Sequence, residues 1–312
     1  MYGRHFRGAP SLARVPTGFH PRESVAPGSI RPAKPSDAET CGRIIYEAFH
    51  GIAADHGFLP DFPTIAAATE LARSFIANPA VFGVVAEQDG EIVGSNFLSE
   101  GDAIRGVGPI TVAPHAQGLG IGRQLMQAVV ERANGAAGIR LLQDAFNMRS
   151  LSLYASLGFE VREPVALMTG RLAGKPAAGV TVRSMTEADL DACDAVCIRV
   201  HGISRRSELG DAVRLFAPRV AERAGRITAY MTAPTFWLAN HAVAESMDDM
   251  QGLLAGVGAV NTEPFSFLLP TRQSALFRWC LKQGLRAAKP MTLMTMGEYR
   301  YPNGAYISSV LY

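Results

Sequence analysis

The stretch PITVAPHAQGLGIGRQLM, residues 109–126, decides the fold expected for this chain. An apolar run over 110–113 predicts a strand, and apolar residues at helical spacing follow from 121 onward. Three glycines at alternate positions, Gly118, Gly120 and Gly122, separate the two patterns. A strand that enters a helix through such a turn presents free backbone N–H groups at the positive end of the helix. The stretch therefore predicts a phosphate-binding turn.

The loop alone does not identify the ligand. It is not a P-loop, because no Lys-Ser or Lys-Thr pair follows the last glycine. It is a poor dinucleotide fingerprint, because its strand begins more than a hundred residues into the chain and no second βαβ unit follows. A glycine-rich connection without any ligand stays open at this point.

Two motifs in the right order carry a family resemblance. Gln117-x-x-Gly120-x-Gly122, after Val112-Ala113-Pro114, resembles the acyl-CoA pyrophosphate loop of the GNAT superfamily of N-acetyltransferases. The segment NMRSLSLYASLGFE, residues 147–160, resembles the second motif of that superfamily. The resemblance covers residues 30 to about 170 and implies an α/β (α+β) fold. Its central sheet should be mixed, mostly antiparallel and flanked by helices, and acetyl-CoA or another acyl-CoA should be the co-substrate.

The patterns place the elements of this first unit as follows. Strands are expected at 29–34, 82–87, 91–99, 104–113, 139–144 and 158–169. Helices are expected at 36–50, 63–77, 120–134 and 148–156.

The chain also repeats itself. Ile30-Arg31-Pro32-Ala33, with Asp37 and Cys41 at fixed spacing, reappears 152 residues later as 182–185 with Asp189 and Cys193. The segments VVAEQDGEIVG (84–94) and RVAERAGRITA (219–229) both predict hairpins. The repeat predicts two copies of one α/β unit, so the whole chain resembles a tandem GNAT protein. The predicted boundaries are a tail at 1–29, a catalytic acyl-CoA-binding domain at 30–170, a linker at 171–179 and a degenerate GNAT-like domain at 180–312.

The second unit is expected to have lost the chemistry. Where the first unit has its glycine loop, the second has Glu245-Ser246-Met247-Asp248-Asp249, and acidic side chains there would repel a pyrophosphate. The segment 274–286 keeps a helix and Gly284 but has no matching tyrosine. The terminal segment 296–312 is aromatic and apolar, which predicts a packed strand and turn rather than a tail.

The resemblance assigns the cofactor contacts. Pantetheine is expected along backbone groups of Ile110, Val112 and Ala113, in a slot between the strands at 104–113 and 139–144. The pyrophosphate should lie on the N–H groups of Gln117, Gly118, Leu119, Gly120, Ile121, Gly122 and Arg123. Asn147 and Ser150 should contact the cofactor, although Asn147 can equally cap the following helix and Ser150 can simply occupy its first turn.

The catalytic roles are assigned in the same way. Tyr154 is the candidate general acid, because a phenol near the thioester can protonate the departing CoA thiolate. Its alternative role is that of a core tyrosine. Glu100 and Asp102 are the candidate general bases, since the strand at 105–112 contains no acid. They can also be ordinary turn residues, with water as the base.

The acceptor amine is expected near the segment 50–63, which is rich in polar and aromatic residues. Its candidate binding residues are His50, Asp55, His56 and Asp61. A metal is not expected, because no second ligand cluster supports one. An acceptor held between the two units is a related hypothesis. It predicts that deleting 180–312 abolishes acceptor use but keeps acetyl-CoA binding.

Composition narrows the class of protein. The chain has 312 residues, 48% hydrophobic and 19% charged, with a net charge of +2. This balance gives no electrostatic case for nucleic acid, and no apolar run approaches a membrane span. Four scattered cysteines predict buried thiols in a reducing cytoplasm. The Arg- and Pro-containing segment 1–29 is expected to be a disordered tail or the product of a misplaced start codon, with a transit peptide as the alternative.

The functional prediction is an N-acyltransferase that moves an acetyl or other acyl group from acyl-CoA to an amine of a small molecule or peptide. The alternative is a non-catalytic acyl-CoA-binding sensor or regulatory protein. A monomer that mimics a dimer through its two units, or a homodimer, is expected.

Overall fold

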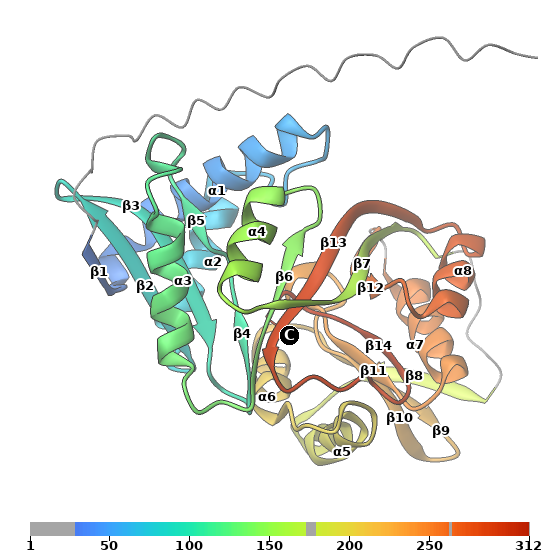
Figure 1. Cartoon of the computed structure of the whole chain (residues 1–312). Coiled ribbons are helices and arrows are strands. Elements are labelled where there is room, and N and C mark those ends of the chain that lie inside the picture. Colours follow the sequence, from blue (N-terminus) through green and yellow to red (C-terminus); the bar gives the residue numbers. More distant parts are fainter. Residues whose placement is uncertain (1–28, 173–178, 262–263, 312) are drawn as a thin grey trace, which may run out of the picture.

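The computed structural model describes residues 29–172, 179–261 and 264–311 of the chain (Figure 1). The tail predicted at 1–29 lies outside the described residues except for Ser29, which begins the first strand. The linker predicted at 171–179 lies outside them over 173–178.

The first half of the chain contains eleven helices and strands that are relevant to the site. They are β1 (Ser29–Pro32), α1 (Ala38–Asp55), α2 (Ile65–Ala77), β2 (Val81–Gln88), β3 (Glu91–Ser99), β4 (Ile104–Val107), β5 (Thr111–Val112), α3 (Ile121–Arg132), β6 (Gly138–Asp144), α4 (Met148–Ser156) and β7 (Glu160–Gly170).

The helices and strands of the second half follow a similar order, but one strand stands where the first half has β4 and β5, and a further strand is added at the end. They are β8 (Val180–Ser184), α5 (Leu190–His201), α6 (Arg206–Leu215), β9 (Arg219–Arg223), β10 (Arg226–Met231), β11 (Ala242–Ala244), α7 (Met247–Val260), β12 (Phe265–Pro270), α8 (Ser274–Lys282), β13 (Arg286–Gly297) and β14 (Ala305–Ile307). The expected α/β class, with mostly antiparallel sheets flanked by helices, is confirmed.

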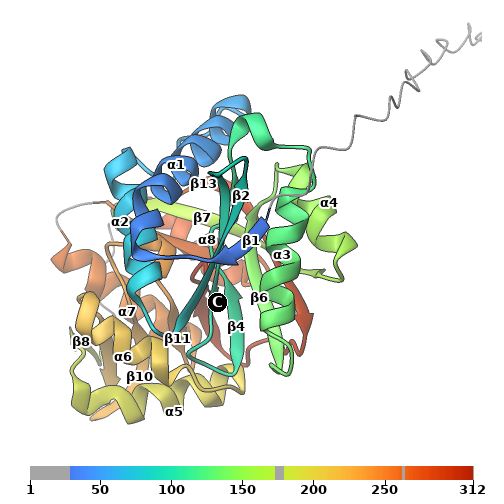
Figure 2. The same cartoon turned by 90° about the vertical axis from the view of Figure 1, so that its left-hand side faces the viewer.

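Helices cover both faces of the first sheet. The side chains of successive residues in a strand point to opposite faces. In β2, Val85 packs with α1 and α2, whereas Val84 packs in the cluster that contains Leu125 and Met126 of α3. Figure 2 shows α1 and α2 on one side of these strands and α3 on the other.

The same ion-pair motif recurs at the start of each half. Arg31 donates to Asp37 at 2.7 and 3.2 Å, and Arg183 donates to Asp189 at 2.8 and 2.8 Å. Each arginine also donates to a glutamate of the following hairpin. Each aspartate accepts a backbone N–H three residues upstream, at 2.8 Å in both halves. The sequence repeat therefore encodes a repeated hydrogen-bonded corner that joins a strand to its first helix.

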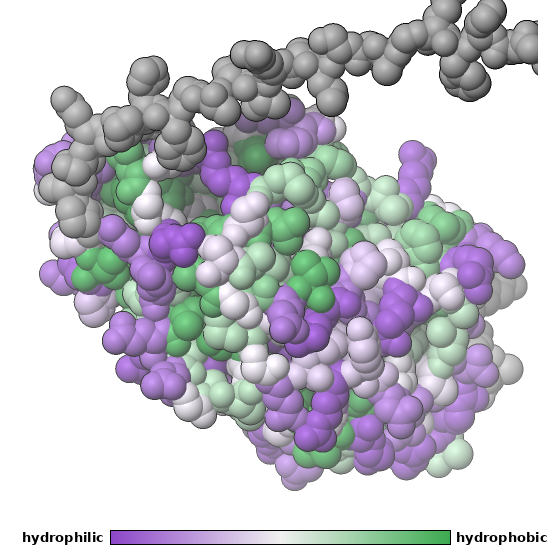
Figure 3. Space-filling view, in the orientation of Figure 1, coloured by the Kyte–Doolittle hydropathy of each residue, from purple (hydrophilic) through white to green (hydrophobic). Residues whose placement is uncertain are grey.

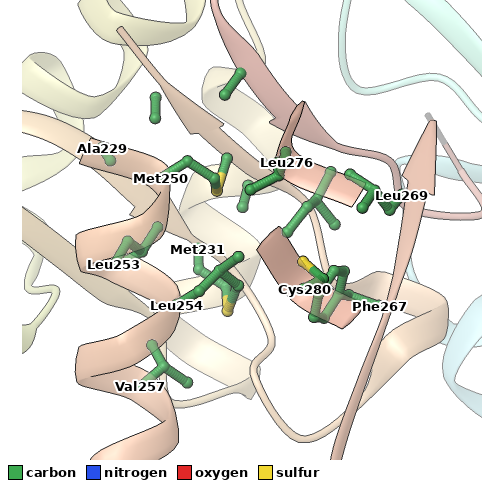
Figure 4. Packing of buried hydrophobic residues seen from close by; sticks show 14 of the residues in the cluster. Ala229, Met231, Met250, Leu253, Leu254, Val257, Phe267, Leu269, Leu276 and Cys280 are labelled. Atoms are coloured by element: carbon green, nitrogen blue, oxygen red, sulfur yellow. The ribbon is translucent and has the colours of Figure 1, made fainter. Parts of the chain in front are cut away.

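The second half has a core of its own between α7, α8 and strands of both sheets (Figure 4). Met231 of β10 and Leu254 of α7 face Phe267 of β12 and Cys280 of α8. All four residues are fully buried. The four cysteines of the chain are buried free thiols, as the sequence predicted.

The second half of the chain contributes two strands to the first sheet. β13 lies between β6 and β7 and is antiparallel to both, and the far edge of β7 pairs with β12 (Figure 1). The first sheet thus takes two strands from the second half of the chain, while β8, β9, β10, β11 and β14 form the other sheet. Deleting 180–312 would remove β13 from the middle of the first sheet. The expectation that such a fragment keeps acetyl-CoA binding therefore does not fit this fold.

Within the described part of the chain, none of the helices has the length and apolar character needed to cross a membrane.

Candidate functional site

A slot opens where β4 and β6 part. The two strands pair in parallel only from Ile104 to Gly106, opposite Gly138 to Arg140. The chain then turns away from β6, and β5 pairs with β3 instead. A cavity of about 280 Å³ occupies this region and extends to the second half of the molecule.

A bulge breaks the strand predicted at 104–113. Ser95 and Leu98 of β3 are three residues apart, whereas their partners Thr111 and Val107 are four apart. The extra residue falls within Gly108-Pro109-Ile110, and Pro109 has no N–H to donate to a ladder. Because the bulge interrupts the ladder, it lets Ile110 line the cavity.

The glycine turn leads into α3 as the sequence predicted. Gly118 and Gly120 have φ angles of 83° and 85°, which residues with a Cβ rarely adopt. Gly120 is the N-cap of α3, and the first helical bonds run from the N–H groups of Arg123 and Gln124 to its carbonyl, at 3.0 and 3.2 Å. The preceding N–H groups stand before the first helical bond, where a helix end attracts anions.

Side chains hold this turn against the strands. The Gln117 amide donates to the Val112 carbonyl at 3.1 Å and accepts from Arg149 at 3.0 Å. The Ala113 N–H donates to Val93 of β3 at 2.8 Å. The backbone N–H of Ala113 is thus used within the sheet, while the Arg149 guanidinium adds positive charge beside the turn.

The structure places Asn147 and Ser150 at the start of α4 and on the cavity wall. The Asn147 side chain caps the helix by accepting the Ser150 N–H at 3.1 Å. The Ser150 hydroxyl donates to Gln143 of β6 at 2.9 Å. The helix-capping alternative for Asn147 therefore describes its contacts in the structure, and a cofactor contact is compatible with it.

Tyr154 lies on α4 and lines the same cavity, although only 6% of it is exposed. Its ring meets that of Phe159 at 6.3 Å. Burial raises the pKa of the Tyr154 phenol, and the nearby negative charge of Asp144 raises it further. The hydroxyl therefore stays protonated at neutral pH, as a proton donor must.

The two candidate bases have structural partners. Glu100 forms a two-bond ion pair with Arg132, at 2.9 Å each, and is not among the cavity-lining residues. Asp102 lines the cavity but accepts the backbone N–H groups of Ser207 and Glu208, at 3.0 and 3.2 Å. Those groups begin α6, so Asp102 caps a helix of the second half.

The four acceptor candidates are not brought together. His50 is exposed and stacks on Tyr46, and Asp55 is exposed at the end of α1. The His56 ring is bonded to the Ile52 carbonyl at 2.9 Å. Asp61 alone among the four lines the cavity.

Asp61 lies beside two residues that the sequence analysis did not single out, Lys289 and Asp144. Lys289 of β13 lies 2.5 Å from Asp61 and 2.7 Å from Asp144, which ends β6. The side chains are 4%, 8% and 8% exposed, respectively. Burial raises the pKa of the Asp144 carboxyl, Lys289 partly offsets this rise, and Asp61 adds to it. Among the residues that the structure describes, no group of three or more His, Cys, Asp or Glu is arranged to hold a metal ion.

The equivalent slot in the second half is filled by the chain itself. β14 pairs along β11, and Ser308 forms an isolated bridge to Leu268 of β12. At the start of α7, the Asp249 carboxylate is bonded to Arg223 at 2.8 Å and to the Ser246 hydroxyl at 2.5 Å. An occupied slot and an acidic helix start both oppose binding of a pyrophosphate there.

Figure 3 shows where polar and apolar side chains lie on the face of the molecule that carries α3 and α4. Apolar side chains reach the surface around α4, whereas polar side chains dominate over the second half. Met148 at the start of α4 is 56% exposed.

Comparisons with known proteins agree with this geometry. Residues 79–161 match the family model described as an acetyltransferase (GNAT) domain. A search of curated proteins found no match. This segment, which spans the bulged strand, the glycine turn and α4, is thus a GNAT acetyltransferase domain.

Solved structures extend the similarity of fold to both halves. A Pyrococcus horikoshii protein assigned as an acetyltransferase is 15% identical, with a TM-score of 0.70 over 93% of this chain and 98% of that one. A GCN5-related N-acetyltransferase from Sphaerobacter thermophilus is 17% identical, with a TM-score of 0.59 over 88% and 96%. The glucosamine N-acetyltransferase region of a fungal β-N-acetylglucosaminidase is 15% identical, with a TM-score of 0.60 over 87% and 38%.

Proposed function

We propose that this chain is an N-acyltransferase that moves an acetyl group from acetyl-CoA to an amine by direct attack. The GNAT domain supports acyl transfer in general, and the finer assignment rests on one arrangement. Ile110, Asn147 and Tyr154 line one cavity at the slot between β4 and β6, and the Gly120 turn begins α3 after β5. The pyrophosphate would lie on the N–H groups at 118–122, because the N–H groups of Gln117 and Arg123 donate to the carbonyls of Pro114 and Gly120. Pantetheine would run along the slot toward Tyr154.

The reaction follows from these positions. The amine nitrogen attacks the thioester carbonyl carbon, the C–S bond breaks, and the amide product forms. Tyr154, which is protonated at neutral pH, donates its proton to the departing CoA sulfur as negative charge develops there. The second half of the chain is a degenerate unit in this proposal. It supplies β13 to the first sheet and walls to the cavity, but no cofactor site.

The test is transfer from acetyl-CoA to a panel of primary amines, with release of free thiol as the readout. The proposal expects thiol release that depends on the amine and is reduced in Tyr154→Phe. Binding of acetyl-CoA without transfer to any amine would instead support the non-catalytic sensor.

A further inference from the structure

The cavity extends from the slot toward residues of the second half, and the side chains that line it indicate which kind of acceptor it binds. Carboxylates of Asp61 and Asp144 line it beside the end of β6. Apolar side chains of Phe49, Phe62 and Trp237 also line the cavity, together with polar ones such as Gln143 and Arg140. Phe62 is 5% exposed, and its ring meets that of Phe49 edge-on at 5.8 Å.

At the site formed by Asp61, Asp144 and Lys289, two acidic side chains face one basic side chain. Among the residues that the structure describes, the Lys289 ammonium is the one basic group that contacts both the Asp61 and the Asp144 carboxyl groups, at 2.5 and 2.7 Å. Ala287 and Lys289 pair with the adjacent residues Met168 and Leu167 of β7, so Ala288 is the extra residue of a β-bulge, and such bulges re-aim side chains. Lys289 also lies 5.5 Å from the centre of the Trp237 ring. A second cation entering the cavity would balance the charge, because an opposite charge stabilises a buried carboxylate.

Other acids on the cavity wall have their own partners. The Glu208 carboxylate pairs with Arg205 and accepts the Ser309 hydroxyl at 3.3 Å. Asp102 accepts two N–H groups of α6. The pair of Asp61 and Asp144 is therefore the acidic site that a cationic group would neutralise.

We infer that the acceptor is a small primary amine with an apolar body, and that Asp144 takes the proton from its ammonium. This inference rests on the proposed function. The cavity is at the small end of the range for ligand sites, which favours a small molecule over a peptide. The ammonium lies against Asp61 and Asp144, and its aromatic or aliphatic body packs on Phe62 and Trp237.

The proton balance of the reaction is then complete. One N–H bond of the ammonium breaks, and its proton passes to the Asp144 carboxylate. The freed lone pair forms the C–N bond, the C–S bond breaks, and the Tyr154 proton goes to sulfur. The charge of Asp144 acts on the Tyr154 phenol, so acid and base are near one another. Charged or titratable groups that act on Asp144 are Lys289, Asp61 and His56.

The test compares two amines of opposite character in the full chain. 2-Phenylethylamine has an apolar body, and serinol (2-amino-1,3-propanediol) has a polar one. The inference expects kcat/KM for 2-phenylethylamine to be at least about 10-fold higher, because an apolar pocket strips water from the hydroxyls of serinol.

The variant Asp144→Asn tests the base. It leaves Lys289 paired with Asp61, so folding should be retained, and a denaturation curve checks this. The inference expects kcat to fall about 100-fold with an unchanged Kd for acetyl-CoA. Asp144→Glu should restore part of kcat. The wild-type fall of kcat at low pH should be absent in Asp144→Asn. Glu70→Gln, on the exposed face of α2, is the control and should behave as wild type.

Different results would overturn the proposed function, the acceptor class and the role of Asp144. No binding of acetyl-CoA and no thiol release with any amine would overturn the proposed function together with the inference. Binding and transfer with serinol used as well as 2-phenylethylamine would overturn the acceptor class alone. A folded Asp144→Asn with wild-type kcat and pH profile would overturn the role of Asp144 alone.

Discussion

Lys289 of the second half places its ammonium 2.7 Å from the Asp144 carboxylate of the first half. The pair exists because β13 is inserted between β6 and β7, so that a residue of the last long strand reaches the end of β6. The same ammonium lies 2.5 Å from Asp61. The two halves are therefore joined at the place where we locate the acceptor.

Replacing Lys289 with methionine should destabilise the protein strongly. The change leaves Asp61 and Asp144 buried side by side without a cation, and breaking a buried pair in this way costs about 3–5 kcal/mol. Urea unfolding at pH 7 measures the loss, and Lys282→Met, at an exposed site on α8, is the control.

The destabilisation of Lys289→Met should shrink at lower pH. Without the cation, the folded-state pKa values of the two carboxyls rise above their unfolded values, so proton uptake favours the folded state. A loss that stays constant between pH 7 and pH 4.5 would contradict this account of the pair.

Tyr154→Phe should reduce kcat by about 10²–10⁴-fold while the Kd for acetyl-CoA stays the same, because the hydroxyl acts on the departing sulfur. Steady-state kinetics with thiol detection and calorimetry separate the two effects. Tyr301→Phe, whose residue is 58% exposed, is the control. Parallel loss of binding and turnover would remove Tyr154 from the chemistry.

Asp189→Asn should weaken the second half by about 1–3 kcal/mol at neutral pH, because Arg183 loses a charged acceptor. Hydrogen bonds from Arg183 hold the pKa of the Asp189 carboxyl far below its usual range. The stability that Asp189 contributes is therefore present above its unfolded pKa, about 3.9, and is lost as the pH falls below it.

The difference in unfolding free energy between wild type and Asp189→Asn should accordingly narrow below about pH 4. Asp191→Asn, whose side chain is 93% exposed, provides the comparison. If the difference is the same at pH 7 and pH 3, the Arg183 pair does not stabilise the fold in the way its geometry indicates.

Local patterns predicted most of the first half. The strand at 91–99 and the helix at 148–156 have their predicted bounds, because the turn at Gly90 and the N-cap Asn147 are local signals. The strand at 104–113 was predicted as continuous, but the bulge at Gly108-Pro109-Ile110 divides it. Pro109 within this strand pattern was a local signal for the break, because proline cannot donate to the ladder.

The insertion of β13 into the first sheet could not be predicted from local patterns. The place of β13 between β6 and β7 depends on pairing between residues more than a hundred positions apart. Alternation of apolar and polar residues predicts a strand but does not indicate which strand it pairs with. The same limit applies to Lys289, whose carboxylate partners come from distant segments. Asp144 had a local signal, since it is an acid at the end of a buried strand and three residues before Asn147.

The central claim is a single acyl-CoA site at the Gly120 turn. Calorimetry of acetyl-CoA binding tests it in the wild type, in Gly120→Glu and in Gly135→Glu. Gly120 and Gly135 lie at opposite ends of α3 with φ angles of 85° and 86°, and a Cβ at either would have no neighbour within 4 Å. The two variants therefore carry the same backbone strain and the same added charge, but only Gly120→Glu puts that charge on the turn.

The account predicts one acetyl-CoA per chain in the wild type and in Gly135→Glu, and no binding in Gly120→Glu. One site is expected because β14 fills the second slot. Two acetyl-CoA molecules per chain, or equal binding by all three proteins, would contradict it.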